Sequence, residues 1–136
     1  IVGTLHYGNV LCAIGTMVRP ALKAARDLEE IGISAEVIDP RTLVPFDEDG
    51  IAASVSKTGR LVLVDEAKDR CGAASYIAGL MADRCFHALK APIKRVTVPN
   101  VSMPYAGNAE SAIFPNPEKI VATVLSIVNA DQKSFA

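Results

Sequence analysis

Wholly apolar runs of strand length alternate with stretches of helical periodicity along this chain. The run from Val10 to Ile14 is typical of a strand buried on both faces, and similar runs predict strands over residues 35–38, 61–64 and 93–98. Between these runs, apolar residues recur at a spacing of three or four, which is typical of helices with one inward face. The pattern therefore predicts strands and helices in alternation.

The expected helices are bounded by residues that commonly start or stop helices. Asp47 and Asn116 fit N-cap positions, Pro117 fits a first turn, and Gly32 and Gly59 fit helix ends. A first helix is expected to turn Val18, Leu22, Ala25, Leu28 and Ile31 inward. Two further helices are expected over residues 48–57, with Ile51 and Val55 inward, and over residues 73–84, with Ile77, Leu80, Met81 and Cys85 inward. The last helix is expected to turn Ile120, Val121, Val124, Leu125 and Val128 inward.

Short connections between alternating strands and helices predict the fold class. Such a chain forms a mainly parallel open sheet with helices on both faces, a three-layer α/β/α domain. We expect one domain over residues 1–130 and a frayed tail over residues 131–136.

Composition narrows the classes of partner. Half of the 136 residues are hydrophobic, 21% are charged, and the net charge of −1 gives no basic footprint for nucleic acid. The apolar runs are too short and too often interrupted by charge to span a membrane. Three cysteines, with Cys12 inside an apolar run, fit a reducing compartment better than a disulfide framework. The start at Ile1 without a methionine is typical of a piece of a longer protein.

The loop over residues 39–47 concentrates charged residues after the second expected strand. Ligands bind at the carboxyl ends of strands in such sheets, so the location permits function. Asp39 and Asp47 are also natural turn and capping residues, and this structural interpretation is the stronger. We therefore expect the Arg41 guanidinium to be at least half buried, bound to Glu66, Glu110 or loop carbonyls.

Other candidate sites are weaker. The segment "RCGAAS" at residues 70–75 can be read as a phosphate cradle at a helix start, although close packing of the helix explains its small residues equally well. Cys71 beside Arg70 could be an activated thiol, but an ordinary one is favoured. His6, Cys85 and His87 with Cys71 are residues of metal-ligand type, but Cys85 and His87 form a single pair without a second pair at ligand spacing, which disfavours a metal site.

Several blocks, in order and spacing, resemble one enzyme family. They are "GTMVRPALKAARDLEEIGISAEVIDPRTLVPFD", "SVSKTGRLVLVDEA", "APIKRV", "MPYA" and a Glu shortly before "FP". Together they resemble the C-terminal domain of the beta subunit of thiamine-diphosphate-dependent 2-oxo acid dehydrogenases, the family of pyruvate, branched-chain 2-oxo acid and acetoin dehydrogenases. This domain is related to the C-terminal domain of transketolase, and the resemblance covers nearly the whole chain.

The resemblance implies where the chemistry lies. In this family thiamine diphosphate and Mg²⁺ sit between a domain of the alpha subunit and an earlier domain of the beta subunit, and neither is in this chain. The sequence also lacks the Gly-Asp-Gly segment that such a diphosphate site needs. We expect no catalytic, cofactor or metal residues here, and partners that comprise the alpha subunit, a second beta subunit and the lipoyl acyltransferase core. The implied compartment is the bacterial cytoplasm, or the mitochondrial matrix for a eukaryotic source.

The resemblance also implies a sheet of about five strands with one antiparallel edge strand that precedes the others in sequence. The strand at 10–14 then lies centrally, which forms a crevice between Gly15, Thr16 and Glu66. A regulatory small molecule binding there is the alternative function, although a crevice filled by Arg41 and neighbouring loops is favoured.

Two further features concern partners. Relatives often carry an acidic residue before "AP", at a position implicated in acyltransferase docking, where this chain has Lys90. A lysine would repel a basic partner, which puts that contact in doubt.

The segment "VSMPYAGNAESAIF" has no regular period and contains Met103, Tyr105, Ile113 and Phe114, so we expect part of it to be an interface.

Overall fold

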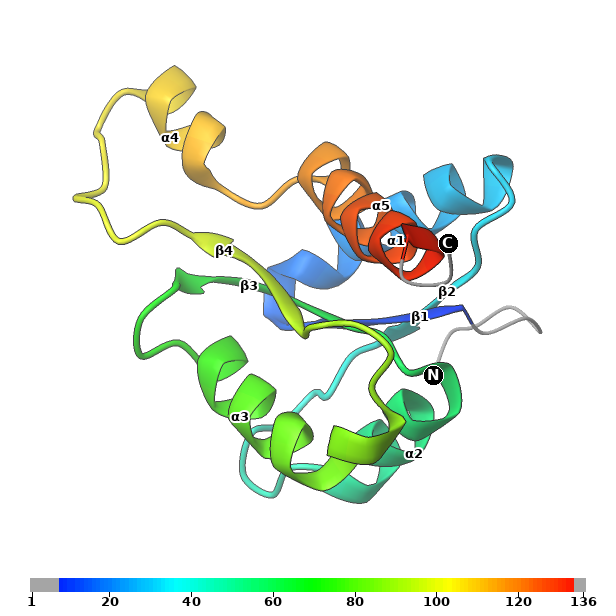
Figure 1. The fold of residues 1–136 in the computed structure, drawn as a ribbon. Helices are drawn as coiled ribbons and strands as arrows, with labels where there is room; N and C mark the ends of the chain where they lie inside the picture. Colours follow the sequence, from blue (N-terminus) through cyan, green and yellow to red (C-terminus); the bar gives the residue numbers. More distant parts are fainter. Residues whose placement is uncertain (1–7, 134–136) are drawn as a thin grey trace.

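The computed structural model describes residues 8–133 and contains one parallel sheet in that range (Figure 1). Each strand pairs in parallel with its neighbours, and the spatial order is β2-β1-β3-β4. The central position expected for the first strand is confirmed. The strands are β1 (Asn9–Ala13), β2 (Ala35–Ile38), β3 (Leu61–Lys68) and β4 (Lys94–Val98).

Helices cover both faces of the sheet, which confirms the three-layer α/β/α class (Figure 1). One face packs against α1 (Val18–Glu30) and α5 (Pro117–Lys133), and the other against α2 (Glu48–Thr58) and α3 (Ala73–Cys85). Two 3-10 turns, η1 (Gly15–Met17) and η2 (Phe86–Ala88), and the short helix α4 (Gly107–Ile113) complete the described elements.

The sheet separates two hydrophobic cores. Leu11, Val62 and Val64 face α1 and α5, while Val10 and Leu63 face α2 and α3. Every residue of β1 is buried because neighbouring strands flank it and helices cover both of its faces.

The inward face of α1 differs from the expected one. Its fully buried residues are Ala21, Ala24 and Leu28, whereas Ile31 is 57% exposed. The small alanines let α1 approach the sheet and α5 closely, and the larger Val18 and Leu22 fill the margins of the contact. The large apolar residues thus marked the edge of the buried stripe rather than its centre.

Both ends of α2 match the sequence prediction. The Asp47 carboxylate accepts a hydrogen bond from the Gly50 amide at 3.0 Å, which caps the first turn. Gly59 follows the helix with φ of 78°, the left-handed conformation that glycine adopts without steric cost. Asn116 likewise caps α5 through the Lys119 amide.

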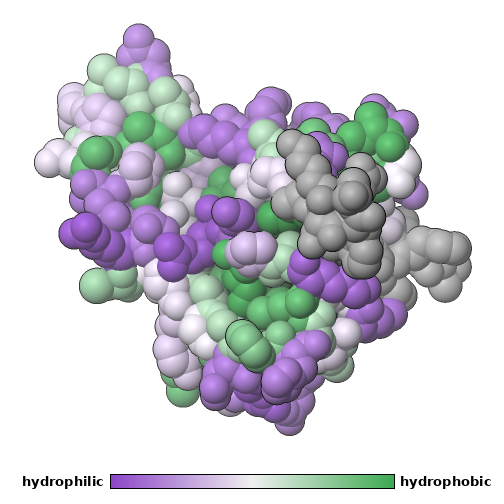
Figure 2. All heavy atoms as spheres, viewed as in Figure 1, coloured by the Kyte–Doolittle hydropathy of each residue, from purple (hydrophilic) through white to green (hydrophobic). Residues whose placement is uncertain are grey.

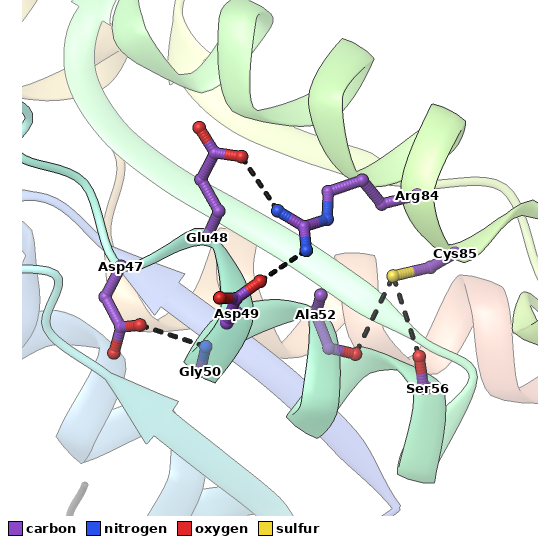
Figure 3. Close-up of polar contacts among 8 residues, drawn as sticks. All are labelled: Asp47, Glu48, Asp49, Gly50, Ala52, Ser56, Arg84 and Cys85. Atoms are coloured by element: carbon purple, nitrogen blue, oxygen red, sulfur yellow. Dashed lines mark hydrogen bonds and ion pairs between the residues drawn. The ribbon is translucent and has the colours of Figure 1, made fainter.

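An ion-pair cluster joins α2 to α3 at the surface (Figure 3). The Arg84 guanidinium contacts Glu48 at 2.8 Å and also contacts Asp49, both in the first turn of α2. These carboxylates raise the pKa of Arg84. Beside this cluster the buried Cys85 thiol lies 3.7 Å from the carbonyl oxygen of Ala52. The two helices are therefore joined by charge at the surface and by packing beneath it.

Three sequence expectations concern the ends of the chain and the segment after β4. The antiparallel edge strand was expected before the strand at 10–14, so it falls on residues outside the described part, and the described sheet has four strands that all pair in parallel. The expected tail begins as helix, because α5 continues to Lys133; residues 134–136 are again outside the described part. The segment after β4, for which no regular period was found, contains the helix α4.

Candidate functional site

The carboxyl ends of β1 and β3 meet at the expected crevice. The Thr16 hydroxyl donates to the Glu66 carboxylate at 2.6 Å. This side-chain hydrogen bond joins the turn that follows β1 to the carboxyl-terminal part of β3. Gly15 precedes Thr16 with φ of 58°, which a residue with a Cβ rarely adopts. The structure thus brings Gly15, Thr16 and Glu66 together.

A pocket of about 200 Å³ adjoins this crevice between the ends of β1 and β2. Ile14 and Gly15 line one side, and the loop from Asp39 to Leu43 lines the other. The pocket therefore lies where the chain leaves two neighbouring parallel strands in different directions, a common ligand position in α/β sheets.

Arg41 does not make the contacts expected of it. Its side chain is exposed, and within residues 8–133 it makes no hydrogen bond or ion pair. Its backbone has φ of 62° and its amide donates to the Asp39 carboxylate at 3.0 Å, a local turn. Glu66 is occupied by Thr16, and Glu110 follows β4 at the opposite edge of the sheet from β2. The predicted bond to Glu66 or Glu110 is wrong.

Asp65 has a structural role that the sequence did not reveal. The side chain is 4% exposed, and its two oxygens accept hydrogen bonds from the Ala67 amide at 3.0 Å and the Ala74 amide at 3.2 Å. It thereby connects the end of β3 to the first turn of α3. The sequence signal for this role was an aspartate directly after the apolar run at residues 61–64.

The "RCGAAS" segment is explained by packing. A Cβ on Gly72 would lie 2.8 Å from the Lys68 carbonyl oxygen, so the approach of α3 to β3 requires glycine. Ala74 behind it is fully buried. Cys71 is exposed and has φ of 62°. The small residues therefore follow from helix-to-strand contact.

Cys12 is the buried thiol predicted from its apolar surroundings. It is fully inaccessible, and burial together with the nearby Asp39 charge raises its pKa to about 12. Such a thiol stays protonated at neutral pH and is a poor nucleophile.

We define the segment from Val101 to Phe114, which carries α4, as the arm. Figure 1 shows it extending beyond the end of β4, and α4 buries no residue. Met103 is 45% exposed and Tyr105 fully exposed, while Ile113 and Phe114 are half-buried. Figure 2 shows hydrophobic residues on this protruding part of the surface.

Lys119 of α5 holds the base of the arm. Its ammonium donates to the carbonyl oxygens of Ala112 at 2.6 Å and Phe114 at 2.7 Å, which satisfies groups at the carboxyl end of α4. The half-buried Glu110 lies on the same short helix. The arm is thus attached by polar contacts at its base, where Ile113 and Phe114 are half-buried, while Met103 and Tyr105 remain exposed.

Lys90 lies at the surface after η2, at the opposite end of β4 from the arm. Its amide donates to the Gly59 carbonyl at 2.8 Å, and its side chain passes close to Gly59 and is exposed. The positive charge of Lys90 therefore faces solvent.

Two negative findings apply to residues 8–133. The described residues contain no group of three or more His, Cys, Asp and Glu side chains that could hold a metal ion. No helix in that range is long and apolar enough to cross a bilayer.

Comparison with known proteins agrees with this architecture. The family model "Transketolase, C-terminal domain" matches residues 9–120. The acetoin:2,6-dichlorophenolindophenol oxidoreductase subunit beta of Bacillus subtilis is 48% identical over 87% of this chain and 34% of its own length. The pyruvate dehydrogenase E1 component subunit beta of the same organism is 43% identical over 84% of this chain and 35% of its own length.

A solved structure supports the same fold. It is titled "Split gene transketolase, inactive beta4 tetramer" and superimposes with a TM-score of 0.75 at 25% identity, covering 91% of this chain and 40% of that chain. The present chain spans about a third of the length of the curated relatives it matches. Since the family model covers β1 through the first turn of α5, the chain belongs to the transketolase C-terminal domain family.

Proposed function

We propose that this chain is the C-terminal assembly domain of the beta subunit of a thiamine-diphosphate-dependent 2-oxo acid or acetoin dehydrogenase. Its similarity to beta subunits of both kinds of enzyme supports this role. In this proposal the domain packs against the alpha subunit and a second beta subunit, and other domains bind thiamine diphosphate and Mg²⁺. Its bacterial relatives favour a bacterial cytoplasmic enzyme.

The observation that carries the proposal is the exposed arm. A helix as short as α4 is not stable in water by itself, and here none of its residues is fully buried against its own domain. Met103 and Tyr105 add apolar surface next to it. In the loop after β2, at the opposite edge of the sheet, Leu43 is 48% and Val44 92% exposed. Subunit contacts would cover such surfaces.

Analytical ultracentrifugation tests the assembly role. We expect the chain to associate as its concentration rises, and Tyr105→Asp or Met103→Asp to reduce that association. Tyr76→Asp is the matched control, because Tyr76 is 65% exposed but lies on α3, away from the arm. A chain that stays monomeric at all concentrations, or association equally sensitive to all three changes, would contradict the arm as an interface.

Docking to the lipoyl acyltransferase core is the finer part of the proposal. Because Lys90 is exposed and positive, we propose that a basic peripheral domain binds weakly at this position. Lys90→Glu should then strengthen binding of a basic acyltransferase docking domain in titration calorimetry. Unchanged affinity would mean that docking uses another surface.

A second candidate function is binding of a regulatory small molecule in the pocket beside Gly15. The favouring observation is Arg41, which lines the pocket and whose side chain makes no hydrogen bond or ion pair with the described residues. A thermal-shift screen with nucleotides, acyl-CoA and phosphates tests it, since a ligand at 100 times its dissociation constant adds about 2.7 kcal/mol of stability. Arg41→Gln should remove the response. A ligand that stabilises both proteins equally would bind elsewhere.

A further inference from the structure

The outer side of β4 is a free sheet edge with a polar groove along it. Among the described residues β4 pairs only with β3, so its other side has no neighbouring strand (Figure 1). A groove of about 500 Å³ follows this side. The β3–α3 turn contributes Asp69 to it, β4 contributes Arg95 and Thr97, and α5 contributes Lys119 and Thr123.

The hydrogen-bond pattern shows which backbone groups face the groove. The Val98 carbonyl accepts the Asp69 amide at 2.8 Å, on the β3 side. Backbone groups of successive residues in a strand point to opposite sides, so those of Arg95 and Thr97 point outward. The edge therefore offers two amides and two carbonyls in the geometry that an added strand requires.

Charge around the groove favours an acidic partner. Arg95 contacts the Asp69 carboxylate through Nε at 3.1 Å and Nη2 at 3.4 Å, and its Nη1 donates to the Ser75 hydroxyl at 3.3 Å, while Lys119 donates to two carbonyl oxygens. Arg95 therefore keeps two of its five N–H groups unused, and Lys119 keeps one of its three. Lys94 is exposed on the same strand. Asp69 is the one acid lining the groove, against Arg95 and Lys119. Figure 2 shows hydrophilic residues over the region where Figure 1 draws β4 and the β3–α3 turn.

The same charges disfavour a second copy of this chain as the occupant. If β4 paired with β4 of another copy, Lys94 and Arg95 would meet the same cations across the new ladder. Like charges on facing strands destabilise a pair, and cations on an edge strand commonly prevent self-pairing.

We propose that the outer edge of β4 binds an extended acidic segment of a partner protein, which adds as a strand beside Arg95 and Thr97. The backbone groups of these two residues supply the ladder, and Arg95 and Lys119 on the two sides of the strand receive alternating carboxylates. This site shares Lys119 with the base of the arm, but its strand edge lies apart from the exposed side chains of the arm and does not depend on the assembly role.

Amide NMR of the 136-residue chain with a synthetic probe tests the proposal. The probe is a capped six-residue peptide that alternates valine and glutamate. We expect saturable shifts at β4 and at the start of α5, and exchange of the Arg95 and Thr97 amides roughly tenfold slower. A peptide with lysine in place of glutamate should not bind. A peptide N-methylated at alternate residues, which keeps the charge but loses ladder donors, should not bind either.

A variant separates strand addition from simple charge attraction. Thr97→Pro removes an outward amide, together with the hydroxyl that donates to Asp69 at 3.2 Å, and leaves the β3 ladder in place, because proline is tolerated at outward positions of edge strands. Thr97→Val removes the hydroxyl alone and is the matched control, which should keep peptide binding. The proline variant should abolish peptide binding while the melting temperature stays close to that of the parent; if it fails to fold, the N-methylated peptide decides the same question. The proposal is overturned by binding that survives N-methylation, by absence of saturable shifts, by the same shifts with inorganic phosphate, or by concentration-dependent protection of Arg95 without peptide.

Discussion

Arg41 holds a backbone conformation that is costly for any residue with a Cβ. Its φ of 62° lies in the left-handed region, and the Asp39 carboxylate fixes the turn by accepting its amide. Sequence reasoning placed this residue in the correct loop but assigned it a partner, because an arginine near strand ends usually bridges loops. The turn itself could not be read from the sequence, since arginine gives no signal for positive φ.

A pair of substitutions at Arg41 measures this strain. Both Arg41→Ala and Arg41→Gly remove the guanidinium, but only alanine keeps a Cβ in the left-handed region. We expect the glycine variant to be more stable by about 1 kcal/mol in urea unfolding. At the exposed helical residue Asp83 the order should reverse, with alanine more stable by about 1 kcal/mol. Equal stabilities at Arg41 would mean that its backbone is not held in this conformation.

Cys12 should make stability depend on pH in the alkaline range. Its pKa is about 12 in the folded state and near 9.0 when unfolded, so only the unfolded thiol ionises between those values. The free energy of unfolding therefore falls as pH rises from 9.0 toward 12, by up to about 1.4 kcal/mol per pH unit.

Comparison with Cys12→Ala isolates this effect from other groups that titrate in alkali. Both proteins should be unfolded with denaturant at several pH values, and the parent should lose stability faster above pH 9.0. Parallel pH profiles would show that the folded environment does not suppress ionisation of the thiol. Below that pH the two profiles should run parallel, since the thiol is then neutral in both states.

At the scale of elements, two glycines of the α3 region have opposite roles. A Cβ on Gly72 would lie 2.8 Å from a backbone oxygen of Lys68, whereas a Cβ on Gly79 would meet nothing within 4 Å. Gly72→Ala should therefore destabilise the fold by about 1–3 kcal/mol through overpacking. Gly79→Ala should stabilise it by about 0.5–1 kcal/mol, because alanine favours a helix interior. Thermal unfolding of both variants checks the signs, and a stabilising Gly72→Ala would contradict the packing explanation.

Elements with a strong apolar period or a clear cap were predicted well from sequence. β1, β2 and α2 follow from apolar runs, from Asp47 and from Gly59, whose effects are local. The buried face of α1 was displaced because close helix packing selected Ala21 and Ala24 over larger neighbours. The helix α4 was missed because it buries no residue in this domain, so it leaves no amphipathic pattern.

At the scale of the whole molecule, the fold class followed from the alternation of strands and helices, whereas the side-chain contacts of Arg41 in the candidate site did not. Parallel pairing places the ends of β1 and β3 together wherever the intervening helices pack, which is why Thr16 and Glu66 meet. The contacts of a loop such as residues 39–43 depend on its turn conformation, which the sequence pattern of strands and helices does not determine. In the proposed assembly role, contacts with other subunits would cover the exposed side chains of the arm, and such contacts leave no local pattern in the sequence of this domain.

The proposed division of labour predicts that this chain alone does not bind thiamine diphosphate tightly or decarboxylate a 2-oxo acid. The diphosphate of the cofactor needs a metal held by oxygen ligands, and activation of the cofactor needs a carboxylate placed against its aminopyrimidine. In the described residues Asp65 accepts backbone amides, Glu66 accepts Thr16, and Asp47 caps a helix. These three carboxylates are engaged in structural contacts.

Titration calorimetry with thiamine diphosphate and Mg²⁺ measures binding directly, and an intact thiamine-dependent dehydrogenase under the same conditions is the positive control. We expect no saturable heat with the chain alone, and no turnover of pyruvate or acetoin with an artificial electron acceptor. Micromolar binding, or turnover by the isolated chain, would show that the catalytic groups lie within these residues and would replace the assembly role with an enzymatic one.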